Sequence, residues 1–122
     1  MTWTLFLDDE RAPTLDLGTE VLIARDCDEA RKFVTEMGVP SVISFDHDLG
    51  KSELAMTFMW WLVDESLDNR LDLMKVTRVI VHSMNPTGAR NIAGLWDGYA
   101  KDLGSEVRAE IQPYRYIRKG QT

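Results

Sequence analysis

The sequence predicts a three-layer α/β fold built on a five-stranded, mainly parallel sheet. Three short apolar runs, residues 3–7, 41–45 and 76–81, each end in polar or titratable side chains. Segments with helical spacing of apolar residues lie between the predicted strands, and this alternation is typical of parallel sheets. At 122 residues the chain has the length of one ordinary domain. We therefore expect a single domain over residues 1–122.

The first strand is expected over residues 3–7, a short aromatic and aliphatic run that charge terminates. Residues 8–20, interrupted by Pro13 and Gly18, are too broken for a full crossover helix and are expected to be mostly loop. A second strand is expected over residues 21–24. The helix that would normally join the first two strands is therefore shortened or missing.

The next helix is expected over residues 27–37. Asp26 is suited to cap it, with Glu29 at the reciprocal position of a capping box, and Gly38 follows as a stop signal. The central strand then covers residues 41–45. Its apolar residues lead directly into Asp46, His47 and Asp48.

A second helix is expected over residues 53–67, capped by Ser52. It is apolar on most sides, with Trp60 and Trp61 in its middle. Either the fold buries this helix on more than one face, or part of it is a surface for a partner; burial is the commoner explanation of such a run.

The last helix begins where Asn85 can cap and Pro86 takes the first helical position, and Gly104 is expected to end it. The strand before it is expected over residues 76–81. Residues 106–111 alternate polar and apolar side chains, which predicts an edge strand with one exposed face. Pro113 is expected to stop that strand.

Composition excludes several classes of protein. The formal net charge of −6 argues against an extended nucleic-acid footprint, because such binding depends on neutralising many phosphates. No apolar run is long enough to cross a membrane, and the N-terminus lacks the pattern of a signal peptide, so the sequence predicts a cytoplasmic protein without a membrane partner. Cys27 is the only cysteine, so no internal disulfide can form.

The polar ends of the three apolar runs are expected to meet, because ligands of open parallel sheets bind beyond the carboxyl ends of the strands. Four carboxylates there form an oxygen-rich set suited to a divalent cation such as magnesium: Asp8, Asp9, Asp46 and Asp48. Some of them could instead cap loops or pair with Arg11 and Lys51. We favour a functional role for Asp9 and Asp46, whereas for Asp8 and Asp48 the two explanations are balanced.

His47 and His82 are the only histidines, and both lie at predicted strand ends in polar motifs. Histidine is the side chain best suited to proton transfer near neutral pH, so the pair could act as general base and general acid. His82 is the stronger candidate. His47 could face away from Asp46 and Asp48, because successive side chains of a strand point to opposite faces.

Groups that could hold a phosphate follow His82. Ser83 and Asn85 can form hydrogen bonds, and the helix start presents unbonded backbone amides beside Gly88, which lets an anion approach closely. Capping by Asn85 alone is the simpler explanation, and the two are compatible. We therefore expect a small phosphate-bearing substrate, or the end of an RNA chain, as the partner.

Three motifs together resemble those of the cyclic-phosphate processing receiver-like family: residues 7–11 (LDDER), residues 45–49 (FDHDL) and residues 82–85 (HSMN). The resemblance covers nearly the whole chain. It implies a flavodoxin-like fold with strand order 2-1-3-4-5 and hydrolysis of cyclic phosphates, such as those at RNA ends.

By the same resemblance, Asp8 and Asp9 match the acidic pair that holds magnesium in receiver domains, and Asp46 matches their phosphate acceptor. Ser83 lies near the position of a receiver hydroxyl. The chain departs from receivers after the last strand, where Gln112 and Pro113 stand in place of a lysine.

The leading hypothesis is therefore a phosphoesterase for a cyclic phosphate. His82 and His47 would transfer protons, Asp9 and Asp46 would orient a histidine or a metal, and Arg11 would help to hold the phosphate. One alternative is a magnesium-binding signalling module phosphorylated on Asp46. Another is a non-enzymatic domain that binds a nucleotide or a protein.

Overall fold

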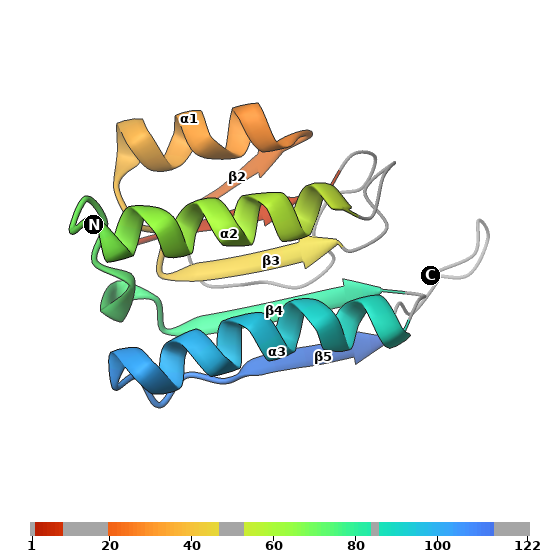
Figure 1. The fold of residues 1–122 in the computed structure, drawn as a ribbon. Coiled ribbons are helices and arrows are strands. Elements are labelled where there is room, and N and C mark those ends of the chain that lie inside the picture. Colours follow the sequence, from red (N-terminus) through yellow and green to blue (C-terminus); the bar gives the residue numbers. More distant parts are fainter. Residues whose placement is uncertain (1, 9–19, 47–52, 84–85, 114–122) are drawn as a thin grey trace.

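The structure is a computed structural model that describes residues 2–8, 20–46, 53–83 and 86–113. Within these segments the elements follow in the order β1 (Trp3–Leu7), β2 (Glu20–Ala24), α1 (Cys27–Met37), β3 (Val42–Asp46), α2 (Glu53–Leu67), the 3₁₀ turn η1 (Leu73–Lys75), β4 (Arg78–Ser83), α3 (Pro86–Leu103) and β5 (Ala109–Pro113) (Figure 1). None of these helices combines the length and the apolar character needed to cross a membrane.

The five strands form one sheet in the order β2-β1-β3-β4-β5, and every neighbouring pair is parallel. This confirms the predicted sheet. In the sheet, β2 lies on one side of β1, whereas β3, β4 and β5 follow one another on the other side of β1. The carboxyl ends of β1 and β3 therefore flank a topological switch point, the usual position of a ligand site in such sheets.

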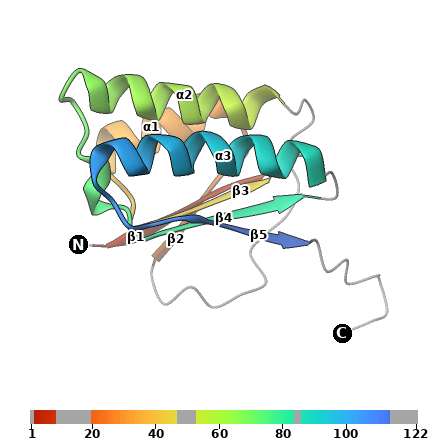
Figure 2. The ribbon, with the colours of Figure 1, turned by 60° about the horizontal axis from the view of Figure 1, so that its bottom comes forward.

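Helices α1, α2 and α3 all lie on the same face of the sheet (Figure 2). The connections that contain them run from β2 to β3, from β3 to β4 and from β4 to β5, so all three advance in one direction across the sheet. Such crossover connections are right-handed. Connections that advance in the same direction therefore place their helices on the same face of the sheet. The described segments thus contain one helical layer, and a second layer, as the three-layer prediction requires, is not among them.

The main core lies between these helices and the sheet. Alternate strand residues face the helices, and the residues on that face of the three central strands are fully or almost fully buried: Trp3, Leu5, Leu7, Ile43, Phe45, Val79 and Val81. The helices contribute the matching surface through buried residues that include Val34, Phe58, Met59, Leu62, Ile92 and Trp96. We call this side of the sheet the helix face and the other side the open face.

Helix ends follow the predicted capping signals. The Asp26 side chain accepts a hydrogen bond from the Glu29 amide at 2.8 Å, and the Glu29 carboxylate accepts one from the Arg25 amide at 2.7 Å. Glu29 therefore returns to the residue before the cap rather than to the cap itself. At the other end Gly38 has φ 85°, a conformation that favours glycine, and its amide donates to the Val34 carbonyl.

The fourth strand begins two residues later than predicted. The amides of Thr77 and Arg78 both donate to the Ser41 carbonyl, at 2.7 and 3.2 Å, and regular pairing with β3 starts only at Arg78. The strand also ends two residues later than predicted, so that it includes His82 and Ser83, which were expected to follow it. Pairing with a neighbour, rather than the apolar run itself, sets these bounds.

Helix α2 owes its apolar composition mainly to burial. Phe58, Met59 and Leu62 are completely buried, and α2 lies between α1 and α3 on the helix face (Figure 1). Trp60, in contrast, is 51% exposed. Burial therefore accounts for most of the apolar residues of this helix, and Trp60 and Leu67, the latter 66% exposed at the end of α2, are the large apolar exceptions among its described side chains.

Candidate functional site

The change from apolar to polar residues occurs at the same level on all five strands. The strand register aligns one apolar residue from each strand in a single row: Ala24, Leu7, Phe45, Val81 and Ile111. The residue that follows each of these five along the chain is polar or charged, and we call this second set the polar row: Arg25, Asp8, Asp46, His82 and Gln112. The polar row lies at the carboxyl edge of the sheet, as predicted for the site.

The described polar-row side chains belong to the open face. Leu7 and Val81 face the helices, so Asp8 and His82, one residue further on, point to the other side. The ring of His82 lies 6.5 Å from that of Phe6, with the two planes inclined at 52°. These rings meet across β3, where the register places Ser44 beside Phe6. The small Ser44 side chain leaves room for this contact.

His82 is partly buried in this arrangement. Burial lowers the pKa of His82 from its ordinary value of 6.5, and the negative charge of Asp8 acts in the opposite direction. Burial is the larger of the two influences. The imidazole is therefore held in its neutral form near pH 7, in which one ring nitrogen can accept a proton.

Asp8 is completely buried although it carries a carboxylate. Its amide donates to the Ala24 carbonyl at 3.0 Å, which extends the pairing of β1 with β2 by one residue. Its own carbonyl accepts a hydrogen bond from Nη1 of Arg25 at 3.2 Å. The backbone of Asp8 is thus fixed on both sides at the switch point.

Asp46 and Ser83 are the last residues of β3 and β4, and the register makes Asp46 the direct partner of His82. Neighbouring strands lie roughly 4.8 Å apart, so the backbone brings these two predicted site residues together. The side chains of Asp46 and Ser83 are not among those described. Gly88 lies buried near the start of α3, the helix that follows β4.

The remaining predicted site residues lie outside the described segments: Asp9, Arg11, His47, Asp48 and Asn85. Within the described segments, no three histidine, cysteine or acidic side chains come together as a metal-binding group. Of the four predicted magnesium ligands, only Asp8 has a side chain that the structure describes. Its complete burial beside the strand that ends in Asp46 suits a carboxylate whose charge a bound cation would offset.

The structure adds three residues that the sequence analysis did not select. Phe6 and Ser44 each precede a site carboxylate by two residues, so the period of a strand places them on the same face as Asp8 and Asp46. Arg25 follows its apolar run as directly as Asp8 follows its own. Both signals were present in the sequence.

Ser44 has an unusual environment. It is 1% exposed, and its hydroxyl has no hydrogen-bond partner among the described residues. A buried hydroxyl without a partner costs about 1–3 kcal/mol. At the amino end of the sheet, the polar residue on the open face of β4 is bonded differently: Arg78 forms two hydrogen bonds, at 2.7 and 2.9 Å, with the Glu110 carboxylate.

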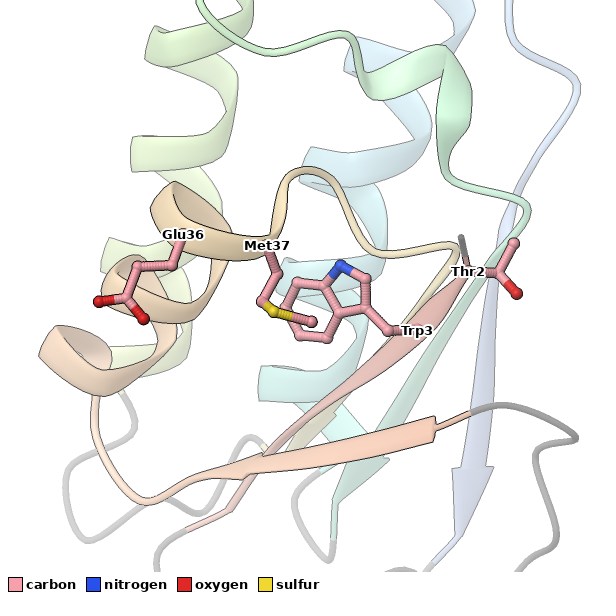
Figure 3. Close-up of a pocket in the computed structure, with 4 residues that line it drawn as sticks. All are labelled: Thr2, Trp3, Glu36 and Met37. Atoms are coloured by element: carbon pink, nitrogen blue, oxygen red, sulfur yellow. The ribbon is translucent and has the colours of Figure 1, made fainter.

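A pocket of about 240 Å³ lies far from the polar row. Thr2, Trp3, Glu36 and Met37 line it, and Figure 3 shows the Met37 side chain beside the Trp3 ring. These residues belong to the start of β1 and the end of α1, so the pocket lies at the amino end of the strands. It is not part of the candidate site.

An all-parallel sheet in the order 2-1-3-4-5, with acidic residues at the ends of its first and third strands, defines an α/β domain of the receiver type. The chain belongs to the family described as the cyclic-phosphate processing receiver domain, whose sequence model matches residues 3–98. The match extends from β1 into α3 and includes four of the five polar-row residues. Comparisons with curated proteins and with solved structures gave no match.

Proposed function

We propose that the protein is a phosphoesterase that hydrolyses a cyclic phosphate at the polar row, with His82 as the principal proton-transfer group. The observation that carries this proposal is the environment of His82. It is kept neutral by burial, lies in register with Asp46 and belongs to a chain of the cyclic-phosphate processing family. A neutral imidazole beside carboxylates is suited to general base catalysis.

The proposed reaction opens a cyclic phosphodiester with one water molecule. Neutral His82 accepts a proton from the water as its oxygen forms a bond to phosphorus. The bond from phosphorus to one ring oxygen breaks, and protonated His47 gives its proton to that leaving oxygen. The product is a phosphate monoester with a neighbouring hydroxyl, and proton exchange with solvent restores both histidines.

The other predicted residues would position the reactants. Asp9 and Asp46 would orient a histidine, since a carboxylate that accepts a ring N–H fixes the tautomer. Arg11, Ser83 and Asn85 would bind the phosphate oxygens together with the amides at the start of α3 near Gly88. A helix N-terminus favours a bound anion through its unpaired amides and its dipole.

Magnesium is the cofactor that suits the carboxylates. Asp8, Asp9, Asp46 and Asp48 would hold it, and the bound ion would offset their mutual repulsion and the negative charge of the phosphate. We propose this as an addition to the histidine chemistry, which balances without it.

A phosphoryl-accepting signalling module is the second candidate. Asp46 ends the third strand beside the strand that leads into Asp8, and this placement favours it. Gln112 and Pro113 at the end of β5 oppose it, because the resemblance to receivers calls for a lysine there. Labelling of Asp46 by acetyl phosphate would support this candidate.

The decisive assay is turnover of an RNA oligonucleotide that ends in a 2′,3′-cyclic phosphate, with magnesium and with a chelator. We expect the unmodified protein to open the ring and His82→Ala to be about 100- to 10,000-fold slower, the usual contribution of a general acid or base. Arg78→Gln is a matched control, because it changes the same strand and face at the opposite end and should retain full activity.

Three outcomes would change the assignment. No ring opening by the folded, unmodified protein under any condition would exclude this substrate and favour binding or signalling. Equal rates for His82→Ala and the unmodified protein would remove His82 from the reaction. Turnover that persists in the chelator would show that the carboxylates do not hold a required metal.

A further inference from the structure

The last strand ends next to the proposed active site. Pro113, the final residue of β5, is the register partner of Ser83, and Gln112 is the partner of His82. Neighbouring strands lie roughly 4.8 Å apart, so the backbone of β5 ends beside two β4 residues that the proposed function uses. The residues that follow Pro113 in the sequence are therefore attached at the carboxyl edge of the sheet.

These following residues are basic and aromatic. Residues 114–119 (YRYIRK), which we call the basic segment, contain three cations and two tyrosines, and residues 111–122 include no acidic side chain. The whole chain carries a net charge of −6. The sign of the charge thus reverses locally, in a segment that is attached beside the site.

Glu110 is the acidic residue nearest to the basic segment in the sequence. Its two carboxylate oxygens accept hydrogen bonds from the Arg78 guanidinium at 2.7 and 2.9 Å. Because Arg78 already balances its charge, Glu110 needs no further cation. The positive charge of the basic segment therefore has a different purpose from pairing with its own strand.

Basic residues interspersed with aromatic ones are typical of segments that bind single-stranded nucleic acid. Cations neutralise backbone phosphates, and aromatic rings stack on bases of any sequence. An RNA with a cyclic phosphate at its end presents both groups on the nucleotides that precede that end. Six residues span at most about 20 Å, which limits such binding to a few nucleotides beside the site. This size agrees with a net charge that argues against an extended nucleic-acid footprint.

We propose that the basic segment binds the single-stranded nucleotides that precede the cyclic phosphate, with its cations on the phosphates and its tyrosines on the bases. The inference rests on the proposed function and specifies its substrate class as an RNA end, rather than a free nucleoside cyclic phosphate. The family model matches residues 3–98, so the basic segment lies beyond the residues that assign the chain to its family. The segment determines substrate affinity and takes no part in the proton transfers.

The test compares a nucleoside 2′,3′-cyclic phosphate with an RNA oligonucleotide of about eight nucleotides that has the same cyclic end. The unmodified protein is expected to prefer the oligonucleotide in kcat/KM by roughly tenfold or more, the range of stacking on a single base. Combined replacement of Arg115, Arg118 and Lys119 by Gln should abolish this preference through a higher KM at unchanged kcat. That change is the signature of lost ground-state binding.

The matched control removes the same charge elsewhere. Combined replacement of Lys32, Lys75 and Lys101 by Gln takes three exposed cations from α1, η1 and α3 and should keep the preference. Salt provides a second measurement. Each phosphate contact on a single strand contributes a slope of about 0.7 to the dependence of log KM on log salt, so loss of the three basic-segment cations should lower the slope by about 2.

Two tyrosine variants separate stacking from charge. Tyr114→Phe combined with Tyr116→Phe keeps both rings and should keep the preference for the oligonucleotide. Replacement of the same two residues by Leu should lose part of the preference and leave the salt slope unchanged, because no cation is removed. Thermal melts establish that each variant is folded.

Equal kcat/KM for the two substrates in the unmodified protein would overturn the role of the basic segment and leave the proposed hydrolysis intact. The same conclusion follows if the basic-segment variant keeps its preference, or if the control variant loses as much. Absence of turnover with either substrate would instead contradict the proposed function. Fluorescence anisotropy with the labelled oligonucleotide then decides: binding that only the basic-segment variant loses would support the role, and any other result would overturn it.

Discussion

The two faces of the sheet use the same strands for different purposes. On the helix face, the described side chains of β1, β3 and β4 are aliphatic or aromatic, and Leu5, Ile43 and Val79 are completely buried. On the open face the same strands combine buried apolar residues such as Phe6 and Ile80 with a buried carboxylate at Asp8 and a buried hydroxyl at Ser44 that has no hydrogen-bond partner among the described residues. Burial is comparable on both faces, whereas the chemistry is not.

This difference shows where the fold tolerates unfavourable groups. Apolar burial on the helix face stabilises the domain, at roughly 25 cal/mol per Å² of buried apolar surface. The open face contains groups that cost free energy to bury, and they are concentrated toward the carboxyl edge. Groups that are costly for folding and placed together at a strand edge are typical of functional sites.

The largest expected effect is on the helix face. Phe58 in α2 is completely buried, with its ring 6.1 Å from Phe45 and 5.7 Å from Trp61. Phe58→Ala should lower the free energy of unfolding by about 3–5 kcal/mol, because it removes packed apolar surface and leaves a cavity. Urea denaturation followed by circular dichroism measures this loss.

The same variant tests whether the faces are separable. Under conditions where Phe58→Ala remains folded, the pKa of His82 should be unchanged, since the substitution lies on the other side of the sheet. A clear shift of that pKa would contradict the separation of the two faces.

An intermediate effect is expected at the contact between Phe6 and His82. Phe6→Leu removes the ring that packs against the imidazole, so His82 should become more hydrated and its pKa should rise toward 6.5. A proton NMR titration of the two histidines, assigned with His82→Gln, measures the shift. An unchanged titration of His82 would show that other groups cause its burial.

The sign of the pH effect follows from the lowered pKa. Well above pH 6.5 His82 is neutral in both the folded and the unfolded chain and does not affect stability. As the pH falls below 6.5 the unfolded chain binds the proton first, so the His82 contribution to stability decreases until the pH passes the folded-state pKa. Phe6→Leu should therefore reduce this acid-induced loss.

The smallest effect distinguishes two serines of one segment. The Ser41 hydroxyl donates to the Trp3 carbonyl at 3.3 Å, whereas that of Ser44 has no partner among the described residues. Ser41→Ala should cost about 1 kcal/mol, and Ser44→Ala should be neutral or stabilising by a similar amount. Urea midpoints measured in parallel check the difference. Destabilisation by Ser44→Ala would reveal a hydrogen bond to this hydroxyl.

Helix ends were predictable because local chemistry determines them. Asp26, Gly38 and Gly104 act on their own neighbours, and α1 and α3 begin and end where these signals and Pro86 predict. Strand ends depend on distant partners. The Ser41 carbonyl, which no pattern within residues 76–83 reveals, shifted the start of β4 by two residues.

The sequence predicted the position of the candidate site in the fold more completely than it predicted the residues that form it. Asp8, Asp46 and His82 were selected because each follows or ends an apolar run, and the structure brings their strand positions together. Phe6 and Ser44 were missed because their own properties are ordinary. They contribute to the site only because strand alternation places them on its face and the cross-strand register places them beside its residues. The alternation can be read from the sequence, whereas the register cannot.

The common level of the polar row links folding to the assembly of the site. A slip of one residue in any strand would turn its side chains to the opposite face, and for β1 it would bring Asp8 against the helices and Leu7 to the site. A chain paired out of register would thus lose core and site together. We expect no compact but inactive form to accumulate, so the fraction of folded molecules should equal the fraction of active ones.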